Sequence, residues 1–177
     1  AGDREGAEAL ARQAAERGNP HVLHDLALMR EGAGDWKGAE ALARQAAEHE
    51  STDALHSLAL MRKKAGKQED AEALARQAAD LGSLPALHSL AVMREEAGHR
   101  ESAETLARQA AGHGSTEALY RIGAMREEAG EREGAETLAR IAADYGNHAL
   151  HTLPKLLNSL WPYGLDPSGK PTPSWQP

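Results

Sequence analysis

A nine-residue stretch that repeats at a fixed spacing is the strongest constraint on this chain. The stretch Ala-Glu-Ala-Leu-Ala-Arg-Gln-Ala-Ala begins at residue 39, and identical or closely similar copies begin at residues 7, 71, 103 and 135. Each copy starts 32 residues after the one before it. A fixed period of this length indicates stacked structural units, each of which buries its apolar face only against its neighbours.

The composition indicates that these units are packed helices with small contact residues. The apolar fraction is 41%, most of it Ala and Leu, and the chain has no Phe. Small side chains let helices approach closely. Because the chain also has no Cys, disulfides, thiolate zinc sites and a cysteine nucleophile are excluded.

Charge and hydropathy narrow the classes of partner. The net charge of −7 argues against nucleic acid, because phosphate backbones are bound by clustered Lys and Arg. No apolar run approaches the roughly 20 residues of a membrane span, and no signal segment opens the chain. We therefore predict a cytoplasmic protein that binds neither membrane nor nucleic acid.

The repeated stretch predicts one helix in each unit, which we call the B helix. In the first copy, over residues 3–16, apolar residues recur at helical spacing at Ala7, Leu10, Ala11 and Ala14. Glu8 and Arg12 stand four positions apart with the acid first, a favourable pair that recurs in every copy. The simplest interpretation of these pairs is a solvated helix face; a binding role is the alternative.

A second helix, the A helix, is predicted at residues 20–32, 52–64, 84–96 and 116–128. Gly18 stands where a B helix needs a left-handed residue to end, a place that Glu50 takes once. We expect the next residue to cap the A helix, with Pro20 at the first helical position; these predicted caps are Asn19, Ser51, Ser83, Ser115 and Asn147.

The A helices carry their own apolar stripe. It consists of Leu23, Leu26 and Ala27 with Met29 alongside, and it recurs in the later copies. The methionines could form an adaptable ligand surface, but at helical spacing beside Leu they favour core packing.

The pattern of residues 55 to 75 resembles the tetratricopeptide and Sel-like repeats. Leu55, Leu58, Ala59 and Arg62, then Gly66, then Ala71 and Ala75 follow the tetratricopeptide order, with small or aliphatic residues where that family prefers aromatic ones. The resemblance covers residues 1 to about 160. It implies an all-α fold, a right-handed α-solenoid of antiparallel helix pairs, here with 32-residue TPR-like repeats.

Arginine stands where the resemblance would place Tyr in each A helix. We predict that each arginine stem lies along the column of small B-helix residues Ala11, Ala43, Ala75 and Ala107, and that its head reaches a B-helix Glu. Ligand binding by these heads is the alternative. The arginines are Arg30, Arg62, Arg94 and Arg126.

The final repeat departs from the pattern. Leu150 aligns with Leu23 only after a one-residue deletion, and Pro154 falls within the helix. We predict a repeat array over residues 1–160, of about five helix pairs that starts mid-repeat, with a capping helix at 148–160. Residues 161–177 form a Pro-rich tail, which could be disordered, a flap over the last repeat, or a ligand for another copy.

The resemblance implies that A helices line a concave groove. Their outward residues form an imidazole and tyrosine column beside an aliphatic column, with Glu31, Lys63, Glu95 and Glu127 further along and His21, Asp53 and Glu117 one turn earlier. Such a surface suits an extended peptide or a partner helix. The predicted partner-binding residues are His24, Leu28, His56, Leu60, His88, Val92, Tyr120, Ala124 and His151.

Other chemistry has weaker signals. Nine His residues raise a metal hypothesis, but a spacing of roughly 10 Å between stacked imidazoles is long for sharing one ion. His21 and His24, three positions apart, are a better pair, but no other copy has both. Mutual repulsion of imidazolium groups near pH 6 would give a pH response. No phosphate loop, His-Glu-x-x-His or activated Ser is present, so we predict no enzyme, metal or cofactor.

The sequence therefore predicts a protein-protein interaction scaffold. We expect it to bind a peptide or protein segment of unknown identity in the groove, as part of a larger protein. The alternatives are self-association into a homo-oligomer, through the open face of the first B helix, and a small-molecule or metal-sensing domain.

Overall fold

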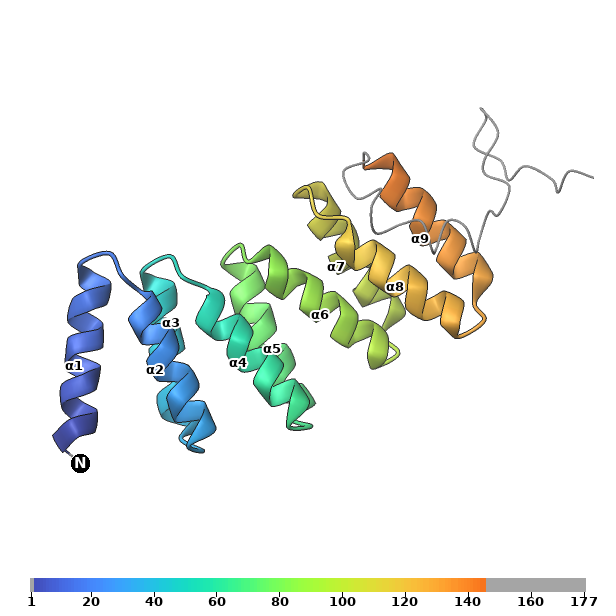
Figure 1. The fold of residues 1–177 in the computed structure, drawn as a ribbon. Coiled ribbons are helices and arrows are strands. Elements are labelled where there is room, and N and C mark those ends of the chain that lie inside the picture. The colour runs from blue at the N-terminus through green and yellow to red at the C-terminus, as the bar shows by residue number, and fades with distance from the viewer. Residues whose placement is uncertain (1, 146–177) are drawn as a thin grey trace, which may run out of the picture. The chain divides into compact units, whose positions relative to one another are not determined.

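The computed structural model describes residues 2–145, and their side chains from residue 6 onward. The described part is all-helical and consists of short antiparallel helix pairs joined by tight turns (Figure 1). The helices are α1 (Gly2–Glu16), α2 (His21–Gly32), α3 (Trp36–Glu48), α4 (Asp53–Lys64), α5 (Gln68–Asp80), α6 (Leu84–Glu96), α7 (Arg100–Gly112), α8 (Glu117–Glu128) and α9 (Arg132–Asp144).

The odd-numbered helices are the predicted B helices and the even-numbered ones the predicted A helices. Every predicted A helix agrees with the structure to within one residue at each end. The predicted capping helix at 148–160 and the tail at 161–177 lie outside the described residues. None of the helices in the described part is long and apolar enough to cross a membrane.

The chain divides into two compact units, residues 1–90 and 91–177. In unit 1, α2 packs on α1, α3 and α4, and α4 packs on α5. In unit 2, α8 packs on α7 and α9. The A helices α2, α4 and α8 therefore each lie against their own B helix, as in a helix-pair solenoid.

Alanine columns form the centre of each unit. Ala39, Ala43 and Ala46 on α3 are fully buried, as are their equivalents on α5, and Leu55 and Leu58 of α4 are buried with them. In unit 2 one cluster joins Ala103 and Ala107 of α7 with Leu119 and Ile122 of α8 and Leu138 of α9. Close approach of small residues thus replaces the aromatic packing that the resemblance would imply.

The B helices α1, α3, α5 and α7 each end in a turn with two paired backbone hydrogen bonds. After α1, Gly18 takes a φ of 88° and donates to the Ala15 carbonyl at 2.9 Å, while Asn19 donates to the Ala14 carbonyl at 2.9 Å. These are the two bonds of a Schellman motif. At the equivalent turn after α3, Glu50 takes a φ of 63°, a left-handed conformation that residues other than Gly rarely adopt.

Most of the predicted caps in the described part of the chain are wrong. The Ser51 N–H binds the Ala46 carbonyl, its buried hydroxyl makes no hydrogen bond to any described residue, and α4 begins after Thr52 without a side-chain cap. In the same way α2 begins after Pro20, and α8 begins after Thr116. Only Ser83 accepts a cap hydrogen bond of the expected kind, from the Ala86 N–H at 3.4 Å. Asn147 lies outside the described residues.

The methionines do not behave alike. Met93 is fully buried, as predicted for core packing, but Met29 is 71% exposed and the prediction is wrong there. Leu26 is likewise only half-buried, whereas its equivalent Leu58 is fully buried. Both exceptions lie on α2, the first A helix.

Candidate functional site

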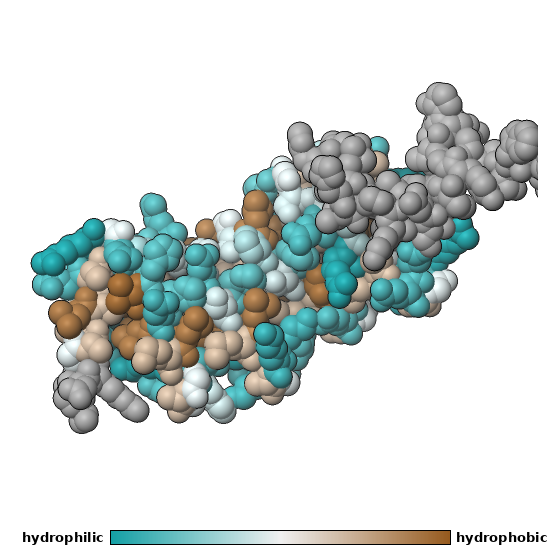
Figure 2. All heavy atoms as spheres, in the orientation of Figure 1, coloured by the Kyte–Doolittle hydropathy of each residue, from teal (hydrophilic) through white to brown (hydrophobic). Residues whose placement is uncertain are grey.

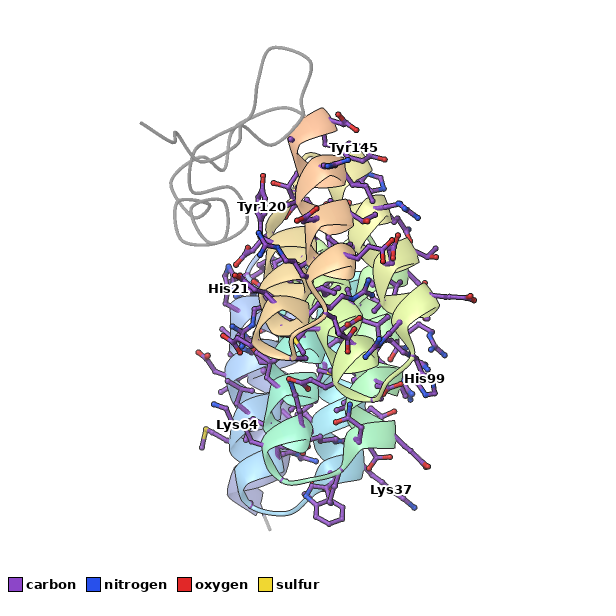
Figure 3. All side chains as sticks on the ribbon, turned by 90° about the vertical axis from the view of Figure 1, so that its right-hand side faces the viewer. His21, Lys37, Lys64, His99, Tyr120 and Tyr145 are labelled. Carbon is purple, nitrogen blue, oxygen red and sulfur yellow. The ribbon has the colours of Figure 1, made fainter. Side chains whose placement is uncertain are left out.

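The predicted groove residues of unit 1 come from three A helices. His24 on α2, His56 on α4 and His88 on α6 are each half-buried. Four positions later, Leu28 is half-buried and Leu60 is 37% exposed. We call these five residues the A-helix row. His21 of α2 and Lys37 of α3 project to opposite sides of unit 1, which shows that the A and B helices present different faces to solvent (Figure 3).

His56 is tied to the neighbouring A helix. Its Nε2 lies 2.9 Å from the Ser89 hydroxyl of α6, a hydrogen bond whose direction depends on the imidazole tautomer. Burial lowers the pKa of His56 below its usual range, and the nearby His88 lowers it further, while Asp53 opposes both effects. His56 is therefore neutral at pH 7 and holds α4 to α6 as a hydrogen-bonded, uncharged ring.

His24 differs from His56. Its Nε2 is buried and makes no hydrogen bond to any described residue. An unsatisfied buried polar atom costs free energy. The A-helix row therefore combines one satisfied imidazole, one unsatisfied imidazole and exposed aliphatic carbon.

In unit 2 the predicted column is less accessible. Tyr120 is only 7% exposed and belongs to the apolar cluster with Leu119 and Leu138, so it does not fit an outward groove position. Val92 and Ala124 are half-buried. His151 lies outside the described residues. Tertiary packing of α8, which the repeat alignment alone does not reveal, accounts for the difference at Tyr120.

Two of the acids that lie further along the A helices each bind an arginine of the following repeat. Glu31 receives Arg62 Nε at 3.2 Å and Nη2 at 3.4 Å, and it is only 8% exposed. In unit 2, Glu95 receives Arg126 Nε at 2.8 Å and Nη2 at 3.0 Å. These acids join repeats to each other and are not a free rim for a ligand, contrary to the sequence interpretation.

The arginine heads also reach the B helices, as predicted. Arg30 Nη2 lies 2.6 Å from Glu8, and Arg62 Nη1 lies 3.3 Å from Glu40. Arg126 Nη1 lies 3.5 Å from Glu104. Burial removes water from Arg62 and would lower its pKa, but its carboxylate partners raise the pKa by more. The hydrogen bond to Glu95 raises the pKa of Arg126.

The repeated Glu and Arg pairs of the B helices are more than a solvated face. Glu8 accepts Arg12 through one oxygen and Arg30 through the other, and Glu40 is shared in the same way by Arg44 and Arg62. The sequence interpretation missed this double use. The signal that could have found it is the constant offset of 22 residues between each B-helix acid and the next A-helix arginine.

Two hollows lie on the B-helix side. One of about 550 Å³ in unit 1 is lined by Arg44, Arg76 and Asp80, among others. One of about 680 Å³ in unit 2 includes Arg100 and Arg132 in its wall. Acidic and basic side chains line both hollows, so neither hollow has an electrostatic potential of a single sign. Across the described residues no three His, Asp or Glu side chains gather in a geometry that could hold a metal ion.

Comparison with known proteins identifies the fold. Neither a protein-family model nor a curated protein sequence matches the chain. Among solved structures, the crystal structure of MamA is similar, with a TM-score of 0.51 and 19% sequence identity over 81% of this chain and 89% of that chain. MamA is a TPR-like protein, and the likeness supports a TPR-like α-solenoid fold for this chain.

Proposed function

We propose that this chain is a non-catalytic protein-interaction module that binds a peptide or protein segment along the A-helix row of unit 1. The observation that carries the proposal is the composition of that row. Exposed Leu60 lies on the same helix face as half-buried His56, and His24 brings a buried nitrogen without a hydrogen-bond partner. Apolar carbon beside a few polar side chains is what a peptide-binding surface offers.

The test is a pull-down from the native host's lysate with matched variants. One variant carries His24→Ala, His56→Ala and His88→Ala. The control carries His49→Ala, His99→Ala and His113→Ala, which removes three exposed imidazoles from the ends of B helices. Circular dichroism first establishes that both variants keep the helicity of the wild type.

The proposal expects a protein that the wild type and the control retain and the A-helix variant loses by at least tenfold. Equal retention by all three would contradict binding at this row. Self-association is the second candidate function, because Leu10 of α1 is 68% exposed. Mass that rises with protein concentration and is insensitive to the A-helix substitutions would favour that candidate.

A further inference from the structure

The last turn of α4 carries more positive charge than the last turn of any other A helix in the described part of the chain. It holds Arg62, Lys63 and Lys64, whereas α2, α6 and α8 each hold one basic residue there. The residues equivalent to the two lysines are Glu31 and Gly32 on α2, Glu95 and Glu96 on α6, and Glu127 and Glu128 on α8. This end of α4 is therefore basic in a chain whose net charge is −7.

Lys63 stands where other A helices carry an acid with a structural role. Glu31 of α2 binds Arg62 of the following repeat. Glu95 of α6 binds Arg126 in the same way. A lysine side chain has no acceptor for an arginine N–H, so Lys63 cannot make this contact. A chain that gives up a repeated contact at one position indicates another use for that position.

The two lysines lie beside the exposed aliphatic part of the A-helix row. Leu60, Lys63 and Lys64 follow the i, i+3, i+4 spacing that places side chains on one helix face. Leu60 is 37% exposed, and Lys64 is exposed as well. Figure 3 shows Lys64 on the side of unit 1 from which His21 projects, opposite Lys37. Hydrophobic and hydrophilic side chains are interspersed over α2 and α4 in Figure 2, so apolar carbon and positive charge are neighbours here.

The acids on the outward side of these two helices are further away or already paired. Asp53 is the first residue of α4, so it lies about 16 Å from Lys64 along the helix axis, whereas Leu60 lies about 6 Å from Lys64. Asp25 stands in the first half of α2. Glu31, near the end of α2, is buried in its ion pair. On these two helices the exposed charge next to Leu60 is therefore positive.

We propose that the segment bound at the A-helix row carries acidic side chains next to aliphatic ones. Its aliphatic side chains lie on Leu28 and Leu60, and an Asp or Glu of the segment pairs with Lys64. Because this inference names the class of the partner, it rests on the proposed function. An exposed ion pair contributes little affinity, but like charges at an interface are costly, so Lys64 acts mainly by excluding basic segments.

The probe is a fluorescent nonapeptide, Gly-Ser-Leu-Glu-Glu-Leu-Glu-Gly-Ser, amidated so that no C-terminal carboxylate is present. Its leucines stand three positions apart, which in an extended chain spans about 10 Å, the distance between neighbouring helices. A matched peptide carries Lys in place of each Glu. Fluorescence anisotropy follows the titration of each peptide with the full chain at low salt, where exposed charges are least screened.

The acidic peptide should bind saturably and about tenfold more tightly than the basic one. Lys64→Glu should weaken binding of the acidic peptide about three- to tenfold and strengthen binding of the basic one. Leu60→Ser should weaken the binding of both peptides. Lys37→Glu, the same charge reversal at an exposed position of α3, should change neither. Because all three positions are exposed, the variants keep the fold, which circular dichroism checks.

Three outcomes would overturn the inference, and only one of them also removes the proposed function. If both peptides bind equally and Leu60→Ser weakens both, the row binds a segment without selecting its charge, and the proposed function stands. If Lys37→Glu acts as strongly as Lys64→Glu, the peptides respond to the charge of the whole chain and not to the end of α4. If neither peptide binds, or Leu60→Ser has no effect, binding at the row fails together with the inference.

Discussion

Arg62 on α4 and Glu31 on α2 form a buried two-point ion pair between consecutive repeats, with nitrogen–oxygen distances of 3.2 and 3.4 Å. Their side chains are 7% and 6% exposed. Arg62 Nη2 also donates to the Trp36 carbonyl at 3.1 Å. Arg126 and Glu95 repeat the arrangement in unit 2. A polar contact thus fixes the register of helices whose apolar contacts are mostly alanine.

Glu31→Gln should lower the free energy of unfolding by about 1–3 kcal/mol, because it leaves a buried guanidinium partly uncompensated. Urea denaturation followed by circular dichroism measures the change. Glu48→Gln, an exposed change on α3, is the control and should stay within about 0.5 kcal/mol. The double variant Glu31→Met and Arg62→Met should cost less than the sum of its single changes. An additive result would mean that the pair is not coupled.

Glu50→Gly should stabilise the chain by about 1 kcal/mol. Glu50 sits at a φ of 63°, where a side chain costs roughly 1–2 kcal/mol and Gly costs little. Gly82 occupies the equivalent place after α5 with a φ of 90°, so Gly82→Ala should destabilise by a similar amount. Thermal denaturation of the two variants gives the sign of each effect. If both changes lower the melting temperature, backbone strain at Glu50 is not significant.

Met29 and Met93 occupy equivalent positions in the repeat, and replacing them should lower the free energy of unfolding by different amounts. Met93→Ala removes a fully buried side chain and should cost about 2–4 kcal/mol, whereas Met29→Ala should cost less than about 1 kcal/mol. Urea midpoints of the two variants test the contrast. Similar losses would show that Met29 is covered in solution.

Because of His56, the free energy of unfolding should decrease as the pH is lowered. Its pKa in the folded chain is lowered, chiefly by burial, so the unfolded chain binds a proton more readily. The contribution is complete above the unfolded pKa of about 6.5 and is lost as the pH falls through the lower folded value. Between pH 7.5 and 5 the melting temperature of the wild type should therefore fall further than that of His56→Gln. The melting temperature of His49→Gln should fall as far as that of the wild type. A folded-state pKa above 6.5, measured by NMR titration, would contradict this.

Most of the fold could be predicted from the repeat period. It located the helices, the left-handed glycines and the arginine contacts to Glu8, Glu40 and Glu104, because each of these depends on residues that recur with the period. It placed the starts of α2 and α4 one residue early, at Pro20 and Thr52, and it did not predict that these two helices lack a side-chain cap.

Features that depend on which neighbour is present were not predictable from one repeat. Met29 and Met93 have equivalent places in the pattern but opposite burial. Glu31 looked like an outward rim residue because its partner, Arg62, belongs to the next repeat. Burial of Tyr120 reflects packing on α7 and α9. The binding role of the A-helix row stays a prediction.

Photo-crosslinking tests the central claim most directly. Benzoylphenylalanine is placed at Leu60 in the A-helix row and, as a control, at Ala41, an exposed position on α3. Each labelled chain is irradiated in native lysate after its helicity has been checked. We predict a discrete adduct with another protein from position 60 that an excess of unlabelled wild-type chain suppresses, and none from position 41. An adduct from position 41 alone, or no adduct from position 60, would contradict binding along the A-helix row.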